Sequence, residues 1–203
     1  MRLTRGITAL VCAACAAVAA LLSLYAPQPV WLDGLLFDGG LAVRAKLERN
    51  PAPAAHVAVV AVDPKSLDAP ELAKLPRAFF GPVWGQLIGD LTGAGAKAIA
   101  FDMLFAYSAS QFQKGYDRPF LESLYRNRSK VVLGRSARGN PARNFYAAMR
   151  NDPTALGTMD VEAAADEVHR SVRTVLTADD GSDYLSLTAA ALLRAGAKGM
   201  PRE

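Results

Sequence analysis

The hydrophobic pattern opens with one long uncharged segment near the N-terminus. Residues 6–32 contain no charged side chain, and about 20 apolar residues are enough to span the hydrocarbon core of a bilayer. Arg2 and Arg5 precede this segment, and Asp33 follows it. Because arginine and lysine remain on the cytoplasmic side, we expect the N-terminus inside the cell and the rest outside. Residues 1–31 are therefore predicted to be a short tip and a transmembrane helix, a single pass in the cell inner membrane.

The same segment also fits a cleaved signal peptide, which has a basic start and an apolar stretch. Small residues such as Ala17 and Ala19 could frame a cleavage site. Its length favours a retained anchor. Under either interpretation, residues 32–203 are exported and form a domain on the periplasmic or extracellular side.

A second helical pattern follows the anchor. Leu32, Leu36, Val43 and Leu47 recur at spacings of four and seven residues, which predicts an amphipathic juxtamembrane helix. A proline-rich loop over residues 50–53 then separates this helix from the next apolar run.

The central part of the chain reads as strand, helix and strand. Residues 56–62 (HVAVVAV) are small and β-branched, which predicts a strand covered on both faces. Residues 80–92 carry an apolar helical stripe that the glycine turn at Gly93 and Gly95 ends, and residues 97–101 predict the next strand. This order is typical of a parallel crossover unit.

Further elements are predicted along the rest of the chain: a helix over residues 117–127, strands over 130–134 and 172–176, and a helix over 185–195. The predicted fold class is α/β, a mostly parallel sheet with flanking helices, preceded by one N-terminal transmembrane helix.

Composition excludes several functions. The net charge is +4, of which Arg2 and Arg5 supply two, and no basic cluster with interleaved aromatics occurs, so nucleic acid is not an expected partner. Both cysteines, Cys12 and Cys15, lie in the anchor. The domain therefore has no disulfide framework and no cysteine metal site. No cofactor, metal site or catalytic set is predicted.

Three charged residues are candidate ligand-binding positions. Asp63 and Asp102 each follow a predicted strand, and the carboxyl ends of neighbouring parallel strands face the crevice where open α/β sheets bind ligands. Arg77 lies at the entrance to the predicted helix, near the Asp63 end. The alternative for the aspartates is structural, since Asp often caps the turn or helix after a strand.

The order of these motifs resembles a known family. The chain reads HVAVVAVDPKSL, then LPR, then a helix, then GAGAKAIAFDMLF, and residues 59–67 and 95–105 match best. This combination resembles the CHASE domain of the second type, an extracellular sensory domain associated with cyclases and histidine kinases. Residues 156–176 resemble a later family region more loosely, with Glu167 where the family has glycine.

The resemblance implies a non-catalytic sensory domain of a transmembrane signalling protein. It implies a homodimer in the membrane that responds to a small-molecule or environmental signal of unknown identity. Further membrane helices and a cyclase, kinase or diguanylate cyclase output would lie beyond residue 203, so the chain is expected to be a fragment or a truncated relative. Two alternatives remain open: an exported metal-dependent phosphohydrolase using Asp63 and Asp102, and a non-catalytic module that docks envelope partners.

Overall fold

The computed structural model describes residues 13–18, 21, 30–47, 56–70, 72–137, 139–161, 173–177 and 181–198. It separates into two units, residues 1–59 and residues 60–203, and each is described by itself.

The first unit contains the predicted juxtamembrane helix, α2 (Val30–Leu47). The helix is confirmed, but its amphipathic character is wrong. Leu35, Leu36 and Phe37 are consecutive, so at about 100° per residue they point over roughly half the helix circumference. All three side chains are exposed, by 62%, 64% and 49%. An apolar surface spread this widely does not define a single buried face.

The predicted membrane anchor falls largely outside the described residues. Its described part, residues 13–18 and 21, is helical. Among the helices that the structure describes, none has the length and apolar character to cross a bilayer. The anchor therefore stays a prediction.

The strand predicted over residues 56–62 is wrong. Residues 57–62 belong to no strand, and Val57 and Val59 are 72% and 88% exposed. Small β-branched residues favour a pleated, half-buried surface, but a strand also needs a neighbour to complete its hydrogen bonds. Within the described part of the chain, these residues have no such backbone partner.

The second unit is built on a parallel sheet of three strands, β1 (Ile99–Leu104), β2 (Val131–Arg135) and β3 (Leu156–Thr158). Their order in the sheet follows the sequence, and both pairings are parallel, with Phe101 opposite Leu133 and Leu133 opposite Leu156. The crossovers pass through α5 (Arg118–Arg126) and α6 (Arg143–Ala148). The predicted α/β class with a parallel sheet is confirmed.

The remaining elements are short, apart from α4 (Gly81–Gly93), which precedes β1. They are α3 (Pro64–Leu67), the 3-10 turns η1 (Arg77–Phe79), η2 (Ala109–Gln111) and η3 (Pro153–Ala155), the antiparallel pair β4 (Val175–Thr177) and β5 (Asp183–Leu185), and α7 (Leu187–Arg194). The glycine turn ends α4 as predicted: Gly95 has a φ of +91°, and the next amide, Ala96 N–H, donates to Leu91 O.

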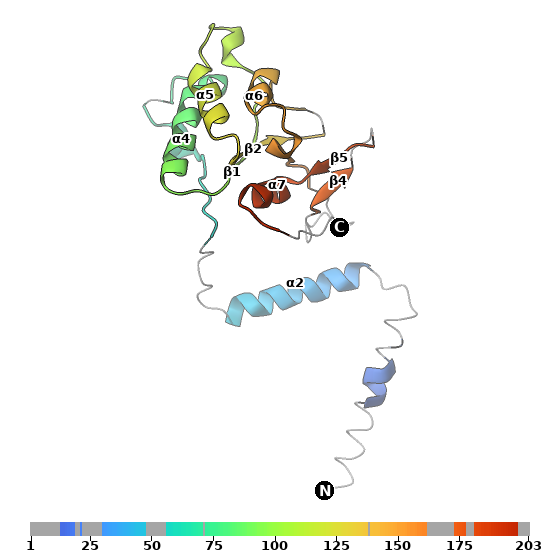
Figure 1. The fold of residues 1–203 in the computed structure, drawn as a ribbon. Coiled ribbons are helices and arrows are strands. Elements are labelled where there is room, and N and C mark those ends of the chain that lie inside the picture. The colour runs from blue at the N-terminus through green and yellow to red at the C-terminus, as the bar shows by residue number, and fades with distance from the viewer. Residues whose placement is uncertain are drawn as a thin grey trace. The chain divides into compact units, whose positions relative to one another are not determined.

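Helices cover both faces of the three-stranded sheet. Figure 1 shows α4, α5 and α6 together on one side of it and α7 on the other. Val131 and Leu133 join the core cluster with α4, α5 and α6, whereas Val132, pointing the opposite way by strand alternation, is also fully buried. Since α7 contacts β1, β2 and β3, it covers that second face.

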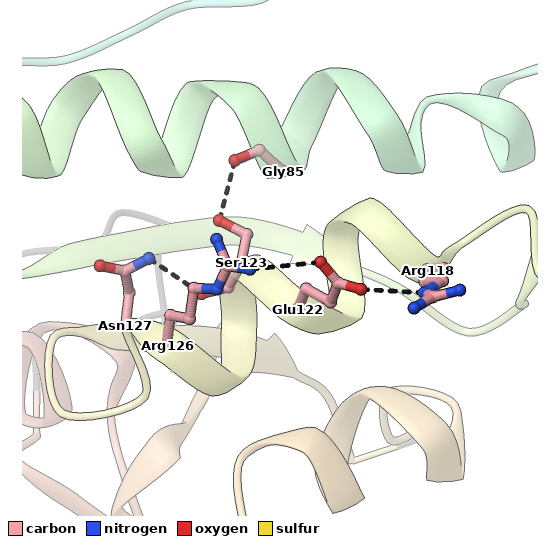
Figure 2. Close-up of polar contacts among 6 residues, drawn as sticks. All are labelled: Gly85, Arg118, Glu122, Ser123, Arg126 and Asn127. Carbon is pink, nitrogen blue, oxygen red and sulfur yellow. Dashed lines mark hydrogen bonds and ion pairs between the residues drawn. The ribbon is translucent and has the colours of Figure 1, made fainter.

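A close helix contact joins α4 to α5. Ser123 Oγ on α5 donates to Gly85 O on α4 at 2.8 Å, as Figure 2 shows, and Glu122 pairs with Arg118 and Arg126 along the exposed side of α5. A Cβ at Gly85 would lie 2.9 Å from Pro119 O on the facing backbone. Glycine at this position therefore sets the separation of the two helices.

This contact predicts opposite effects for one substitution made one turn apart. Gly85→Ala should lower the free energy of unfolding by about 1–3 kcal/mol, because backbone must move to admit the methyl group. Gly89→Ala, where nothing lies within 4 Å, should raise it by about 0.5–1 kcal/mol through helix propensity. Denaturant unfolding of both variants measures the two changes. Equal effects of the same sign would contradict the close helix contact.

An ion pair fastens α7 to the turn before β3. Arg194 Nη2 donates to Asp152 Oδ2 at 2.7 Å, with the two side chains 12% and 38% exposed. Partial burial acts to raise the pKa of Asp152, but hydrogen bonds from Thr154 and Arg194 outweigh it and hold that pKa below its ordinary value. The ionised form of Asp152 thus stabilises the folded state.

The lowered pKa gives this contact a defined pH dependence. Since the folded-state pKa lies below the unfolded value of about 3.9, the stabilisation is present above that pH and is lost as the pH falls through the folded pKa. Asp152→Asn should cost about 1–2 kcal/mol at neutral pH, a range reduced for partial exposure. The difference from the unsubstituted protein should shrink below about pH 4.

Urea unfolding at a series of pH values tests this, with Asp90→Asn, an exposed change on α4, as the control that stays within about 0.5 kcal/mol. A cost for Asp152→Asn that is independent of pH would contradict the assignment.

Candidate ligand-binding site

A cavity of about 190 Å³ lies between the start of α4, the segment after β1 and the start of α5. The beginnings of α4 and α5 reach it because Gly85 lets the two helices approach closely. Its lining combines aromatic rings with two charged residues, Arg77 and Asp117. Mostly apolar walls with a few polar groups are typical of small-molecule sites.

Four aromatic residues form the apolar wall: Trp84, Phe105, Phe120 and Phe145. Their rings pack on one another, with the centroids of Phe105 and Phe120 5.1 Å apart and those of Phe120 and Phe145 also 5.1 Å apart. Three of them are nearly or fully buried, Trp84 at 9%, Phe120 at 0% and Phe145 at 2%. The wall is therefore part of the hydrophobic core and is rigidly placed.

Asp117 is the most unusual residue of the cavity. It precedes α5, is 1% exposed, and accepts hydrogen bonds at Oδ2 from Ser108 Oγ (2.5 Å) and Ser110 N–H (3.0 Å). Asn144 on α6 in turn donates to Ser108 Oγ, so the η2 turn holds this carboxylate and α6 supports the turn. Its other oxygen, Oδ1, is buried and has no hydrogen-bond partner. Leaving such an acceptor unsatisfied is costly, and a functional role is one of the few explanations for retaining that cost.

Gly81 allows the carboxylate to occupy this place. A Cβ at Gly81 would lie 2.7 Å from Asp117 Oδ1, so only glycine lets the oxygen rest against the first turn of α4. The start of a helix carries partial positive charge, which favours a carboxylate there. Electrostatics thus offset part of the cost of burying Asp117.

The predicted ligand residues end up in three different settings. Arg77 lines the cavity from η1, with its side chain exposed at the surface. Asp63 caps α3 instead: its Oδ1 accepts from Ser66 N–H at 2.8 Å and Ser66 Oγ at 2.7 Å. These bonds, from the Ser66 hydroxyl first and its amide second, hold the pKa of Asp63 below its ordinary value. The alternative structural role of Asp63 therefore has direct geometric support.

Asp102 lies inside β1 with its side chain exposed, rather than at the end of the strand. Because no strand forms over residues 57–62, Asp63 and Asp102 do not share the edge of a parallel sheet, and the geometric reason for pairing them is wrong. Neither lines the cavity. Ligand binding by these two residues stays a prediction without that basis.

Sequence reasoning missed Asp117 as a site residue. The sequence predicts Asp117 only as the start of a helix, and its partners Ser108 and Ser110 lie in a segment with no periodic pattern. The available signal was an aspartate between a glycine turn and Arg118-Pro119, which marks a helix start but not burial. The described residues also hold no cluster of three or more His, Cys, Asp or Glu that could bind a metal ion.

The sequence matches the family described as CHASE2 domain over residues 13–202. No curated protein and no solved structure matches it significantly. CHASE2 domains are extracellular sensory domains of signalling proteins. With nearly its whole length inside the match, the chain belongs to the CHASE2 domain family.

Proposed function

We propose that this chain is the extracytoplasmic sensory domain of a transmembrane signal-transduction protein, and that its signal is a small molecule bound in the cavity between α4 and α5. The observation that carries the proposal is the buried, half-satisfied carboxylate of Asp117, which lines the same cavity as Trp84 and three phenylalanines. A ligand that supplies the missing hydrogen bond recovers free energy that the unliganded protein lacks. The domain itself has no catalytic role.

Signal transmission follows from where the cavity lies. Its lining comes from η1, α4, the segment after β1, α5 and α6, so an occupant contacts elements that are far apart in the sequence. A ligand can shift a conformational equilibrium only through different affinities for two states. We infer that the occupied cavity favours one arrangement of α4 and α5, and that the membrane anchor predicted within residues 1–31 carries this change towards a kinase or cyclase output.

A homodimer completes the proposal. Two anchored chains can change the distance or the angle between their membrane helices, and such a change can be passed across the membrane. A single anchor has no second helix relative to which it could move. In α2, Gly39 and Gly40 have nothing within 4 Å of where a Cβ would stand, so another helix can approach closely there. Sedimentation of the full chain in detergent should give twice the monomer mass, and a monomer at every concentration would contradict this part.

Thermal unfolding in the presence of a compound library tests the sensory function. The full chain in detergent is screened against small amines, carboxylates, amino acids, sugars and nucleosides. We expect at least one class to raise the midpoint of unfolding, since a ligand at a hundred times its Kd stabilises by about 2.7 kcal/mol. The gain should disappear in Asp117→Asn. A library without any stabilising compound would contradict the proposal.

A further inference from the structure

The two charged residues of the cavity have opposite signs and do not meet. The hydrogen bonds of Asp117 go to Ser108 and Ser110, and its Oδ1 has no partner, so Arg77 does not neutralise it. Within the described part of the chain, the Arg77 guanidinium has no hydrogen bond or ion pair either. Two unpaired opposite charges across one cavity call for a ligand that carries both signs.

The surroundings of Asp117 specify the positive end. An acceptor that is 1% exposed needs a donor, and a charged donor gives the strongest hydrogen bond to a carboxylate. Aromatic rings attract a cation beyond what their apolar area provides, and Trp84 and three phenylalanines share the lining with Asp117. An ammonium group satisfies both, whereas a neutral hydroxyl satisfies only the first.

Arg77 specifies the negative end. Its planar guanidinium offers paired N–H donors that match a carboxylate in two-point geometry. It is exposed where it lines the cavity, while Asp117 is buried, so the ligand enters with its ammonium end first.

The volume limits the length between the two ends. A cavity of 150 Å³ in a protein core accommodates benzene, so about 190 Å³ holds a molecule of roughly seven to nine non-hydrogen atoms. Sugars of ordinary size, nucleosides and peptides are too large for it.

We propose that the cavity binds a small amino carboxylate, with its ammonium group donating to Asp117 Oδ1 against the aromatic wall and its carboxylate held by Arg77. The assignment rests on the sensory function proposed above and narrows its signal to one chemical class.

A series of probes that differ only in length tests the assignment. Glycine, β-alanine, γ-aminobutyrate and δ-aminovalerate place the same two charges progressively farther apart. Butylamine and butyrate each keep one charge and serve as matched probes. Binding to the full chain is followed by the unfolding midpoint and by fluorescence of Trp84 in a Trp31→Phe background, since these are the two tryptophans of the sequence. We expect one length to bind best, about tenfold or more tighter than either single-charge probe.

Two variants test which residue binds which end of the ligand. Asp117→Asn keeps an oxygen for Ser108 and Ser110 but removes the charge, and should weaken the best zwitterion and butylamine about tenfold or more while leaving butyrate unchanged. Arg77→Gln, an exposed change, should weaken the zwitterion and butyrate but not butylamine. The charge-matched controls Asp90→Asn and Arg118→Gln alter exposed side chains that do not line the cavity and should change none of the affinities. If Asp117→Asn does not fold, Arg77→Gln and the length series still decide.

The outcomes separate this inference from the function on which it rests. Binding of butylamine or butyrate as tight as that of every zwitterion overturns the inference. Stabilisation by a different class of library compound, lost in Asp117→Asn, also overturns the inference. In both cases the proposed sensory function stands. Failure of all probes and of the whole library overturns both.

Discussion

Phe120→Ala should lower the free energy of unfolding by about 3–5 kcal/mol, the usual cost of removing a fully buried phenylalanine ring. Phe120 is 0% exposed, and its ring centre lies 6.4 Å from that of Phe101 and 5.1 Å from those of Phe105 and Phe145. The ring therefore joins α5 to β1, to the segment after it and to α6. With a total stability of 5–15 kcal/mol for an ordinary domain, this loss is a large share.

The matched control is Phe112→Ala, which removes the same ring from a position that is 73% exposed. Its only close ring neighbour among the described residues is Phe79, with centroids 6.2 Å apart. We expect a change within about 0.5 kcal/mol. Chemical denaturation of the two variants measures both values, and a comparable loss in each would show that the aromatic wall is not the centre of the core.

Gly157→Ala should cost about 3 kcal/mol, at the upper end of the range for overpacking a core. A Cβ at this position in β3 would lie 2.5 Å from Leu187 Cα and 3.0 Å from Leu187 N. Both are backbone atoms at the start of α7, so no change of rotamer can make room. The helix must move away from the sheet, and the contacts of α7 with β1 and β2 weaken together.

Gly139→Ala is the control, because its Cβ would meet only Leu104 Cδ2, at 3.1 Å, the end of a side chain that is 37% exposed and free to turn aside. That change should stay within about 1 kcal/mol. Adding Leu187→Ala to Gly157→Ala provides a second check. Since the contact is with backbone, shortening the side chain should not restore stability, and recovery would place the conflict on Leu187 Cδ1 instead.

In the second unit, the sequence predicts an element correctly where its local hydrophobic pattern matches the way the element is buried in the fold. The helix expected over residues 80–92 appears as Gly81–Gly93, and the strand expected over 130–134 appears as Val131–Arg135. The helix carries an apolar stripe at helical spacing. The strand is a continuous apolar run, as expected for a strand that is covered on both faces. The strand expected over 172–176 appears as Val175–Thr177, whereas residues 162–172 of the looser family resemblance lie outside the described residues.

Residues 57–62 could not be judged in the same way. Their valines give the same local signal as β2, because strand propensity describes a side chain and not the presence of a neighbouring strand. The wrong strand also misplaces the predicted site, since the grouping of Asp63 with Asp102 depends on a shared sheet edge.

The place of Arg77 at the cavity could be predicted from the sequence, because Arg77 directly precedes the α4 helix. Asp117 could not be foreseen, because its burial depends on Gly81 of another element and on two serines upstream. Local patterns locate helix starts, but they do not tell which two helix starts will face each other.

The position of α7 constrains the order in which the chain can fold during synthesis. The strands and crossovers of the sheet follow one another in sequence, so each can add to the last as it emerges. One face of the sheet nevertheless stays uncovered until residues 187–194 have been synthesised. Val132 and the paired glycines Gly134 and Gly157 lie on that face. A chain that ends before residue 187 should therefore be bound by chaperones and cleaved by proteases, whereas a chain that includes residues 187–194 should resist both.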